Sequence, residues 1–374
     1  MKITDLKVER YGQQREGGGM PRSEIQIVRL ETDEGITGTG FLSAGNSPVS
    51  PLGDMLVGLL RTNLRNIVMG QDPLLNESLW RRMTEQLVGR RGAKGVLLQC
   101  VAAVDFAVWD IKAQRFGRPL GDLFGERRER IPTYANAAHQ ASPQAAAETA
   151  AEYVSKGHTA VKIRGARTVG TPAEATKRLQ AVREAVGPDI KIMIDVNGTW
   201  DVDTAIQQLK AFERYDLYWL EEPVPSDDIQ GYVKVKQHAG RTYIVGGEQH
   251  VGITEFRALL GHEAVDIVQP GAGIMGGITE WLRIYNLATA YGVAVSPWDL
   301  QAIHMHMAAG LSNVKWLEYF MPDNPMLGFQ NSLFAEPRFR EERTEEGVFL
   351  LPPDSPGIGI KLDPAFAEQT LMRE

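Results

Sequence analysis

Cysteine is nearly absent from this chain of 374 residues, which contains only Cys100. A single cysteine excludes an internal disulfide framework. Because Cys100 lies in the largely apolar run Val96–Ala103, we expect a small buried side chain and not a nucleophile. No run approaches the roughly 18 apolar residues of a membrane span, and the amino terminus lacks the apolar core of a signal peptide. We therefore expect a cytoplasmic protein with no membrane partner.

Positive charge is in deficit. The chain has 40 lysines and arginines against 47 acidic residues, which gives a formal net charge of −7. This balance argues against a general nucleic-acid surface and against binding to anionic membranes. Hydrophobic residues make up 43% and charged residues 23%, as is ordinary for a globular protein. An anionic ligand would therefore have to be held by local positive charge.

The first third of the chain has the pattern of a small mixed domain. Residues 2–8 and 24–30 alternate apolar and polar side chains, as strands do, and the segments after them have helical spacing. Strands followed by segregated helices predict an α+β domain over residues 1–125. Between the first two strands, the Gly17–Arg22 loop contains three consecutive glycines. We expect either a mobile lid that carries the charge of Arg22 or a disordered hairpin loop.

From Ile131 the pattern changes to alternating strands and helices. The strand-like segments are 132–135, 160–163, 191–194, 217–220, 243–245, 265–268, 293–296 and 314–317. Eight strands with seven clear intervening helices predict an α/β fold, a modified (β/α)8-type TIM barrel with seven full βα units, over residues 126–340. Residues 341–374, rich in proline and glycine, are predicted to pack back on the first domain.

Acidic residues mark the ends of three consecutive predicted strands. Asp195, Glu221 and Glu248 are roughly 20–30 residues apart, which is the length of a βα unit. Barrel closure would bring the three carboxylates together, where like charges cannot all stay ionised without a partner. A divalent cation resolves this conflict, and an all-oxygen ligand set favours Mg²⁺, with Mn²⁺ as the alternative.

Two cationic residues end the preceding predicted strand. Lys162 and Arg164 project to the same side, because side chains two apart in a strand share a face. With a metal opposite, they form a site for a small carboxylate and stabilise the dianion made when its α-proton leaves. Crowding by Arg164 and a metal would disfavour the ammonium form of Lys162 and make it a base. The alternative is that both residues only form salt bridges with the acids.

Ordered motifs along the chain resemble a known family. They are Lys162–Arg164, Ile194–Gly198, Trp219–Pro223, Gly246–Gln249, Gly276–Thr279 and Trp316–Glu318. They are similar to the strand-end signatures of the enolase superfamily, and in particular of its mandelate racemase-like subgroup, which includes many acid-sugar dehydratases. The segment Ala103–Ala113 resembles that family's helix leading into the barrel, and residues 352–363 resemble its carboxy terminus. The resemblance covers nearly the whole chain.

The resemblance assigns roles to several residues. It implies that Asp195, Glu221 and Glu248 bind magnesium and that Glu318 hydrogen-bonds the substrate carboxylate, while Glu222 supports the ligands. It also implies that the first domain is a capping domain, that its Gly17–Arg22 loop is the specificity lid and contributes Arg22 to substrate binding, and that the protein is an even-numbered homo-oligomer.

Three positions depart from the family's pattern. Arg164 stands where the family has a lysine base, and arginine is not deprotonated at ordinary pH. Gly271 and Trp298 stand where the family has the aspartate and histidine of a catalytic dyad. Because a racemase needs a base on each face of its substrate, these departures disfavour 1,1-proton transfer.

Dehydration needs one base and an acid for the leaving hydroxide. Lys162 is the candidate base, and Asp299 is a second acid–base or hydroxyl-binding group unless it only caps the helix that follows. Asn197 is expected beside Asp195, binding a substrate hydroxyl. Trp298 either forms a stacking wall against a polyol chain or fills the space of the missing histidine.

Three histidines complete the set of candidates. His250 lies two residues past Glu248, within reach of the pocket mouth, whereas His304 and His306 alternate with methionines in a helical stretch and are expected to serve packing.

We interpret the chain as a magnesium enzyme that removes the proton next to a carboxylate and expels the neighbouring hydroxyl. The substrate would be a sugar acid, aldonic or aldaric, and the product a 2-keto-3-deoxy acid. Two alternatives stay open. One is a cycloisomerase or epimerase acting on a lactone or another carboxylate, and the other is a vestigial member that binds metal without turnover.

Overall fold

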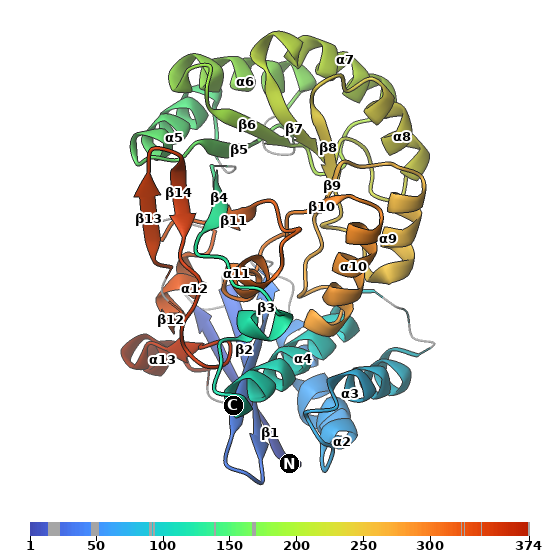
Figure 1. The fold of residues 1–374 in the computed structure, drawn as a ribbon, viewed down its shortest axis with the longest axis vertical. Helices are drawn as coiled ribbons and strands as arrows, with labels where there is room; N and C mark the ends of the chain where they lie inside the picture. Colours follow the sequence, from blue (N-terminus) through green and yellow to red (C-terminus); the bar gives the residue numbers. More distant parts are fainter. Residues whose placement is uncertain are drawn as a thin grey trace.

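The computed structural model describes most of the chain. The described residues are 1–13, 23–45, 52–89, 92, 94–137, 140–166, 170–322, 324, 326–337 and 339–372. Figure 1 shows a barrel ringed by helices, with a smaller domain against one of its ends. None of the helices in these ranges is long and apolar enough to cross a membrane.

Eight parallel strands form the barrel. They are β4 (Ile131–Asn136), β5 (Ala160–Arg164), β6 (Lys191–Asp195), β7 (Leu217–Glu221), β8 (Tyr243–Gly246), β9 (Ile267–Val268), β10 (Ala294–Val295) and β11 (Leu317–Tyr319). Neighbours pair in chain order from β4 to β10, and β11 pairs with β4. A single bridge between Val295 and Val314 closes the ring. The predicted (β/α)8-type TIM barrel is therefore confirmed.

Seven helices connect these strands and cover the barrel from outside (Figure 1). They are α5 (Pro143–Ser155), α6 (Pro172–Val186), α7 (Val202–Phe212), α8 (Ile229–Gln237), α9 (Gly252–Gly261), α10 (Ile278–Ala290) and α11 (Gln301–Gly310). Side-chain oxygens of Ser142, Thr171 and Asp201 accept hydrogen bonds at the starts of α5, α6 and α7. These caps satisfy backbone N–H groups that have no partner within a helix.

The barrel interior changes from apolar to charged along its axis. Six side chains fill an apolar layer: Tyr134, Ala160, Met193, Trp219, Val245 and Ile267. Two residues further along four of these strands, the inward positions are Asn136, Lys162, Asp195 and Glu221. Because side chains in a strand alternate with a period of two, the same alternation that packs the apolar layer places these polar groups at the carboxyl-terminal mouth.

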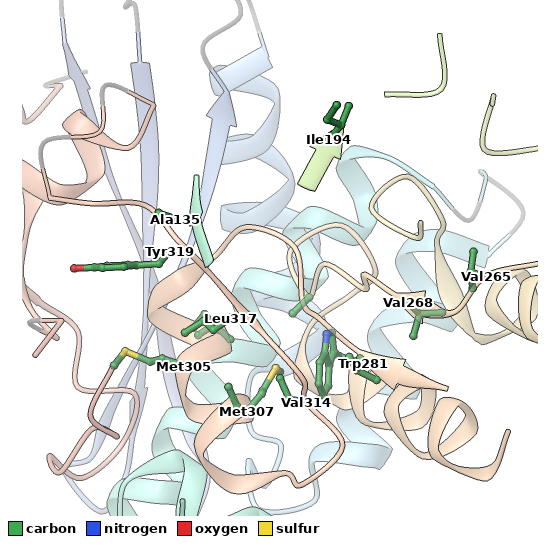
Figure 2. Packing of buried hydrophobic residues seen from close by; sticks show 14 of the residues in the cluster. Ala135, Ile194, Val265, Val268, Trp281, Met305, Met307, Val314, Leu317 and Tyr319 are labelled. Atoms are coloured by element: carbon green, nitrogen blue, oxygen red, sulfur yellow. The ribbon is translucent and has the colours of Figure 1, made fainter. Parts of the chain in front are cut away.

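A larger apolar core lies between the strands and their helices. Figure 2 shows Trp281 of α10 beside this core, with Met305 and Met307 of α11 and Leu317 of β11, all of them buried. The expectation that the histidine–methionine stretch of α11 serves packing is confirmed for its methionines. His304 has a further contact, described below.

The amino-terminal domain consists of an antiparallel sheet covered by helices. Its strands are β1 (Ile3–Gln13), β2 (Ser23–Thr32) and β3 (Thr37–Gly45), paired in that order. Its helices are α1 (Leu52–Gly58), α2 (Arg65–Val68), α3 (Asn76–Met83) and α4 (Val96–Arg115), with π-helical segments at Leu59–Leu64 and Thr84–Val88. Cys100 is fully buried in α4, and burial raises the pKa of its thiol to about 12, as expected for a packing residue.

Helix α4 joins this domain to the barrel. The carboxylate of Asp105 accepts hydrogen bonds from the Thr279 backbone N–H at 3.0 Å and from the Thr279 hydroxyl at 2.7 Å. It therefore caps the first turn of α10 from outside, since Gly277, which precedes that helix, has no side chain to do so. Trp80 and Trp109 add hydrogen bonds to Gly276 and Thr279. The glycine pair thus lets the two domains approach closely at the barrel mouth.

The carboxy-terminal segment touches both parts of the molecule. Strands β13 (Glu341–Thr344) and β14 (Gly347–Leu350) form a hairpin whose second strand pairs with β4 of the barrel. Helix α12 (Gly328–Leu333) leads into β12 (Phe334–Glu336), which pairs with β15 (Lys361–Leu362). After α13 (Pro364–Thr370), Leu371 bridges to Tyr11 of β1. The boundaries at residues 125 and 340 stay predictions.

We predict that Gly40→Ala destabilises the protein by about 1–3 kcal/mol or more, as overpacking does. A Cβ at position 40 would lie 1.8 Å from the Ala103 carbonyl oxygen of α4, so helix and sheet would have to separate. Chemical denaturation measures the change. The matched control is Gly58→Ala, because Gly58 is helical and a Cβ there would meet nothing within 4 Å. An unchanged unfolding midpoint in Gly40→Ala would contradict the close packing of α4 on β3.

Candidate active site

Three carboxylates meet at the mouth of the barrel. Asp195 ends β6, Glu221 ends β7 and Glu248 lies two residues beyond β8. One oxygen from each lies within 4.8 Å of the others. Asp195 is 2% exposed, Glu221 is 0% exposed and Glu248 is 9% exposed. The structure therefore brings together the three acids predicted from the sequence.

Burial and mutual repulsion make this cluster electrostatically unfavourable by itself. Burial raises the pKa of Glu221 to about 7, with Asp195 and Glu318 adding to the increase and Lys162 opposing it. Burial, followed by the charges of Asp195 and the two neighbouring glutamates, raises the pKa of Glu248 well above its usual value. Positive charge is required for all three acids to stay ionised near neutral pH.

The donor atoms suit a hard divalent cation. The cluster offers carboxylate oxygens, which Mg²⁺ prefers. Glu221 Oε2 is buried with no hydrogen-bond partner, so one ligand atom faces the cluster without a proton donor. Asn197 holds the ligands in place, since its Nδ2 donates to Asp195 at 2.9 Å and to Glu248 at 3.4 Å. The residues present therefore fit a magnesium ion.

Glu222 lies outside the three-acid cluster. Its carboxylate accepts a hydrogen bond from Gln249 Nε2 at 2.6 Å. Its backbone has φ of 47°, an uncommon value for a residue with a side chain. Burial and repulsion from Asp195 raise its pKa to about 8. These contacts agree with the expectation that Glu221, and not Glu222, faces the other two acids.

Lys162 lies between two carboxylates. Its Nζ is 2.9 Å from Glu221 Oε1 and 2.7 Å from Glu318 Oε1. Burial favours the neutral amine, but the charges of these two glutamates outweigh it, and the pKa is raised well above its usual value. These two acids favour the ammonium form. The expectation that Arg164 and a bound metal disfavour it, and so make Lys162 a base, stays a prediction.

Arg164 also forms an ion pair. Its Nη1 lies 3.1 Å from Asp195 Oδ2, and its side chain is 11% exposed. Both cationic residues therefore make the salt bridges considered as the alternative to a catalytic role. Their positions beside the acids still place two positive charges at the mouth, and their catalytic role stays a prediction.

Glu318 connects three parts of the mouth. One oxygen accepts hydrogen bonds from Lys162 and from Asn136 Nδ2, the latter at 2.7 Å, and the other accepts one from the Asp299 backbone N–H at 3.2 Å. Asn136 was not among the residues predicted from the sequence, although it ends β4 at the position equivalent to Lys162 in β5. The alignment of strand ends could have found it.

Trp298 and Gly271 are packed directly against each other. A Cβ on Gly271 would lie 2.7 Å from Trp298 Cε3. The two residues at the positions of the missing dyad therefore form one wall, and the small residue makes room for the large one. Trp298 also lines a cavity of about 220 Å³ with residues of β3, among them Phe41 and Ser43. Trp298 therefore lines the wall of this cavity and also fills the space beside Gly271.

Asp299 does not cap the helix after it. Helix α11 begins at Gln301 and is preceded by Leu300, and no side chain caps its first turn. The capping alternative is therefore wrong. Asp299 and Leu300 instead have φ of 56° and 41°, two adjacent strained positions. Asp299 lines the Trp298 cavity and a neighbouring one of about 190 Å³.

Two candidates are not placed at the metal cluster by the described residues. Arg22 and the whole Gly17–Arg22 loop lie outside these residues, so the predicted substrate contact of Arg22 stays a prediction. His250 is buried with its ring 5.9 Å from that of Phe256, and neither cavity beside Asp299 is lined by it. Its predicted functional role stays a prediction.

Comparison with known proteins identifies the family. Residues 13–125 match the model of the mandelate racemase / muconate lactonizing enzyme amino-terminal domain, and residues 145–366 match the enolase C-terminal domain-like model. The chain belongs to the mandelate racemase-like subgroup of the enolase superfamily. The resemblance inferred from its motifs is confirmed, and the first domain is the capping domain of this fold.

Members of the enolase superfamily with known activities are similar over most of their length. L-talarate/galactarate dehydratase of Salmonella typhimurium is 30% identical over 343 residues, which are 88% of this chain and 80% of the relative. 3,6-Anhydro-alpha-L-galactonate cycloisomerase of Streptomyces coelicolor is 29% identical over 92% of this chain and 91% of the relative.

Two solved structures are similar to this chain over its whole length or nearly so. L-talarate dehydratase from Polaromonas sp. JS666, complexed with Mg and L-glucarate, has a TM-score of 0.84 and 27% identity, and the match covers 100% of this chain and 98% of the other. A racemase from Streptomyces coelicolor with bound magnesium has a TM-score of 0.85 and 26% identity over 99% of this chain and 100% of the other. Enzymes with this fold and bound magnesium are therefore among the relatives.

We predict that Lys162→Met binds Mg²⁺ about tenfold more tightly, equivalent to about 1.4 kcal/mol. The ammonium 2.9 Å from Glu221 Oε1 competes with a cation for this oxygen, and methionine keeps the length of the side chain without its charge. Calorimetric titration with Mg²⁺ measures the affinity. Lys177→Met, on the exposed side of α6, is the matched control. Weaker binding in Lys162→Met would mean that the lysine orients Glu221 for the metal.

We also predict that Gly271→Ala lowers the free energy of unfolding by about 1–3 kcal/mol. The cost arises because the new Cβ meets the Trp298 ring, so it should largely disappear in a Trp298→Leu background. A double-mutant cycle of denaturation midpoints measures this coupling. Equal costs in both backgrounds would show that the ring does not constrain position 271.

Proposed function

We propose that this enzyme is a magnesium-dependent dehydratase that converts a sugar acid, aldonic or aldaric, into a 2-keto-3-deoxy acid. The observation that carries the proposal is the buried cluster of Asp195, Glu221 and Glu248 beside Lys162 and Arg164. It combines a site for a divalent cation with local positive charge for an anion, in a chain whose net charge is −7. Relatives named L-talarate/galactarate, arabinonate and L-rhamnonate dehydratase support this reaction class.

A cation at this site would stabilise the negative charge that develops during the reaction. Removal of the proton next to a carboxylate creates a dianion, and a cation bound to the three acids supplies positive charge that stabilises it. Asp195, Glu221 and Glu248 would hold Mg²⁺, or Mn²⁺ in its place.

The other residues of the mouth orient the substrate. Lys162 and Arg164 attract its carboxylate, and Glu318, which Lys162 and Asn136 hold in place, accepts a hydrogen bond from a substrate hydroxyl. Asn197 Oδ1 is buried without a hydrogen-bond partner and accepts one from a substrate hydroxyl. Burial of these groups strengthens each interaction, because the surrounding dielectric is low.

A cycloisomerase is the second candidate. Relatives named 3,6-anhydro-alpha-L-galactonate cycloisomerase and D-galactarolactone cycloisomerase favour it. That reaction yields no 2-keto acid, so product analysis separates the two. A vestigial metal-binding protein would give neither product. We also propose an even-numbered homo-oligomer, on the family resemblance, which the molecular mass in solution tests.

We predict that the purified protein with Mg²⁺ forms 2-keto acid from at least one member of a panel of aldonic and aldaric acids. Chelation should abolish the activity, and Glu221→Gln should lose both turnover and Mg²⁺ binding, because the cluster loses a charged ligand. Keto-acid derivatisation and Mg²⁺ titration provide the two readouts. If no member of the panel yields 2-keto acid while Mg²⁺ binding is intact, the result would contradict dehydration and favour the other two candidates.

A further inference from the structure

Dehydration requires a group that takes the α-proton and a group that protonates the departing hydroxide. The residues nearest the metal cluster are poorly placed for either task. Gly271 and Trp298 have no side-chain group that ionises near neutral pH, Arg164 is paired with Asp195, and Lys162 Nζ is enclosed by two carboxylates at 2.9 and 2.7 Å. The proton-transfer group should therefore come from another part of the mouth.

Asp299 is an acid on the loop after β10 that could serve as this group. It lines both cavities between the barrel mouth and the strands β2 and β3 of the capping domain. The Leu300 backbone N–H lowers the pKa of its carboxyl, and among the described residues no cation forms an ion pair with it. Its own backbone N–H donates to Glu318 Oε2 at 3.2 Å. Asp299 is thus connected to the Lys162 side of the mouth through Glu318.

The backbone around Asp299 is strained, and the side chain of His304 holds it in place. Asp299 and Leu300 have φ of 56° and 41°, and such strain persists only where neighbouring contacts impose it. His304, fully buried in the first turn of α11, provides these contacts. Its Nδ1 lies 2.6 Å from the Asp299 carbonyl oxygen, and its Nε2 lies 3.2 Å from the Ala272 backbone nitrogen.

These contacts decide the tautomer of His304. The Ala272 N–H can only donate, so Nε2 accepts and has no proton, and Nδ1–H donates to the Asp299 carbonyl. Burial lowers the pKa of His304 to about 4, so the ring stays neutral near neutral pH. One imidazole therefore ties the loop after β9, which contains Gly271, to the loop after β10, which contains Trp298 and Asp299.

We propose that Asp299 is the catalytic acid–base group of the dehydration and that His304 is the residue that positions it. This proposal deepens the proposed function and rests on it. The Asp299 carboxylate takes the α-proton, and the electron pair of the broken C–H bond enters the substrate carboxylate system. The pair then returns to form the C=C bond as the β C–O bond breaks.

Asp299 also donates the proton in the second step. The protonated Asp299 gives it to the departing hydroxide, which leaves as water, and the carboxylate is restored. The enol that remains becomes the 2-keto-3-deoxy acid by tautomerisation. Because one group serves both steps, the α-hydrogen and the β-hydroxyl leave from the same face of the substrate.

The pKa of Asp299 suits a group that first accepts a proton and then donates it. Burial raises the pKa of this carboxyl to about 6; the Leu300 N–H and the charge of Lys162 lower it, and the charge of Glu318 raises it. The carboxylate form needed at the start is therefore populated above about pH 6 and lost as the pH falls. A group with a pKa near the working pH is an efficient acid–base catalyst.

The first experiment uses Asp299→Asn in the Mg²⁺-loaded protein. Its readouts are exchange of the substrate α-hydrogen in D₂O, 2-keto acid formation and Mg²⁺ affinity. We expect both reaction rates to fall by roughly 10²–10⁴-fold, with Mg²⁺ affinity unchanged, because Asp299 is not a metal ligand. Asp203→Asn, exposed on α7, is the matched control. Retained α-hydrogen exchange in Asp299→Asn would overturn the proposal.

The second experiment separates positioning by His304 from a packing role. His306 is the control, because it lies on the same helix, is equally buried and contacts the Ile358 backbone oxygen instead. We expect His304→Leu to lower kcat about 10-fold or more with little change in KM, since a misplaced acid–base group loses part of its contribution. His304→Asn keeps a donor near the Asp299 carbonyl and should restore part of kcat. His306→Leu should lower the melting temperature and retain kcat.

The outcomes distinguish this proposal from the proposed function. Wild-type exchange without keto acid would contradict dehydration, while loss of that exchange in Asp299→Asn would still support Asp299 as the base. Neither exchange nor keto acid in the wild type would remove both proposals. Equal losses of kcat in His304→Leu and His306→Leu would overturn the positioning role.

Discussion

Repulsion among buried carboxylates is the constraint on which the mouth of this barrel depends. One oxygen from each of Asp195, Glu221 and Glu248 lies within 4.8 Å of the others, and the three residues are at most 9% exposed. Two cationic side chains, Lys162 and Arg164, each form an ion pair with one of these acids. These pairs offset part of the negative charge, and a divalent cation bound to the three acids would offset the remainder. The same positive charge is what a carboxylate substrate and its dianion require.

The two domains contribute unequally to this mouth. The barrel strands supply the charged side chains, because their carboxyl ends converge. The capping domain supplies part of the cavity walls, and its long helix α4 reaches the barrel through the buried Asp105, which caps α10. The close approach depends on Gly277, where a Cβ would lie 2.3 Å from Asp105 Oδ2. Packing between the domains therefore determines the shape of the pocket, and the residues at the ends of the barrel strands determine its charge.

Most of the barrel and its acids could be predicted from the sequence. Apolar runs of strand length recur at the βα period, and a charged residue at the end of each run must face the mouth if the layer below it is apolar. Two features could not be predicted, because each depends on contacts formed only in the folded chain. Lys162 is held by Glu318, 156 residues away, and Asp299 lines the cavities instead of capping α11.

The sequence by itself determined the fold class, the family and the three acids of the cluster, because these follow from local periodicity and from motifs that are contiguous in the chain. Only the tertiary structure decided the ion pairs of Lys162, the packing of Trp298 on Gly271 and the link from His304 to the turn at Asp299. Charge states and hydrogen-bond partners depend on distances between segments that are far apart in sequence, and these distances exist only after the barrel closes.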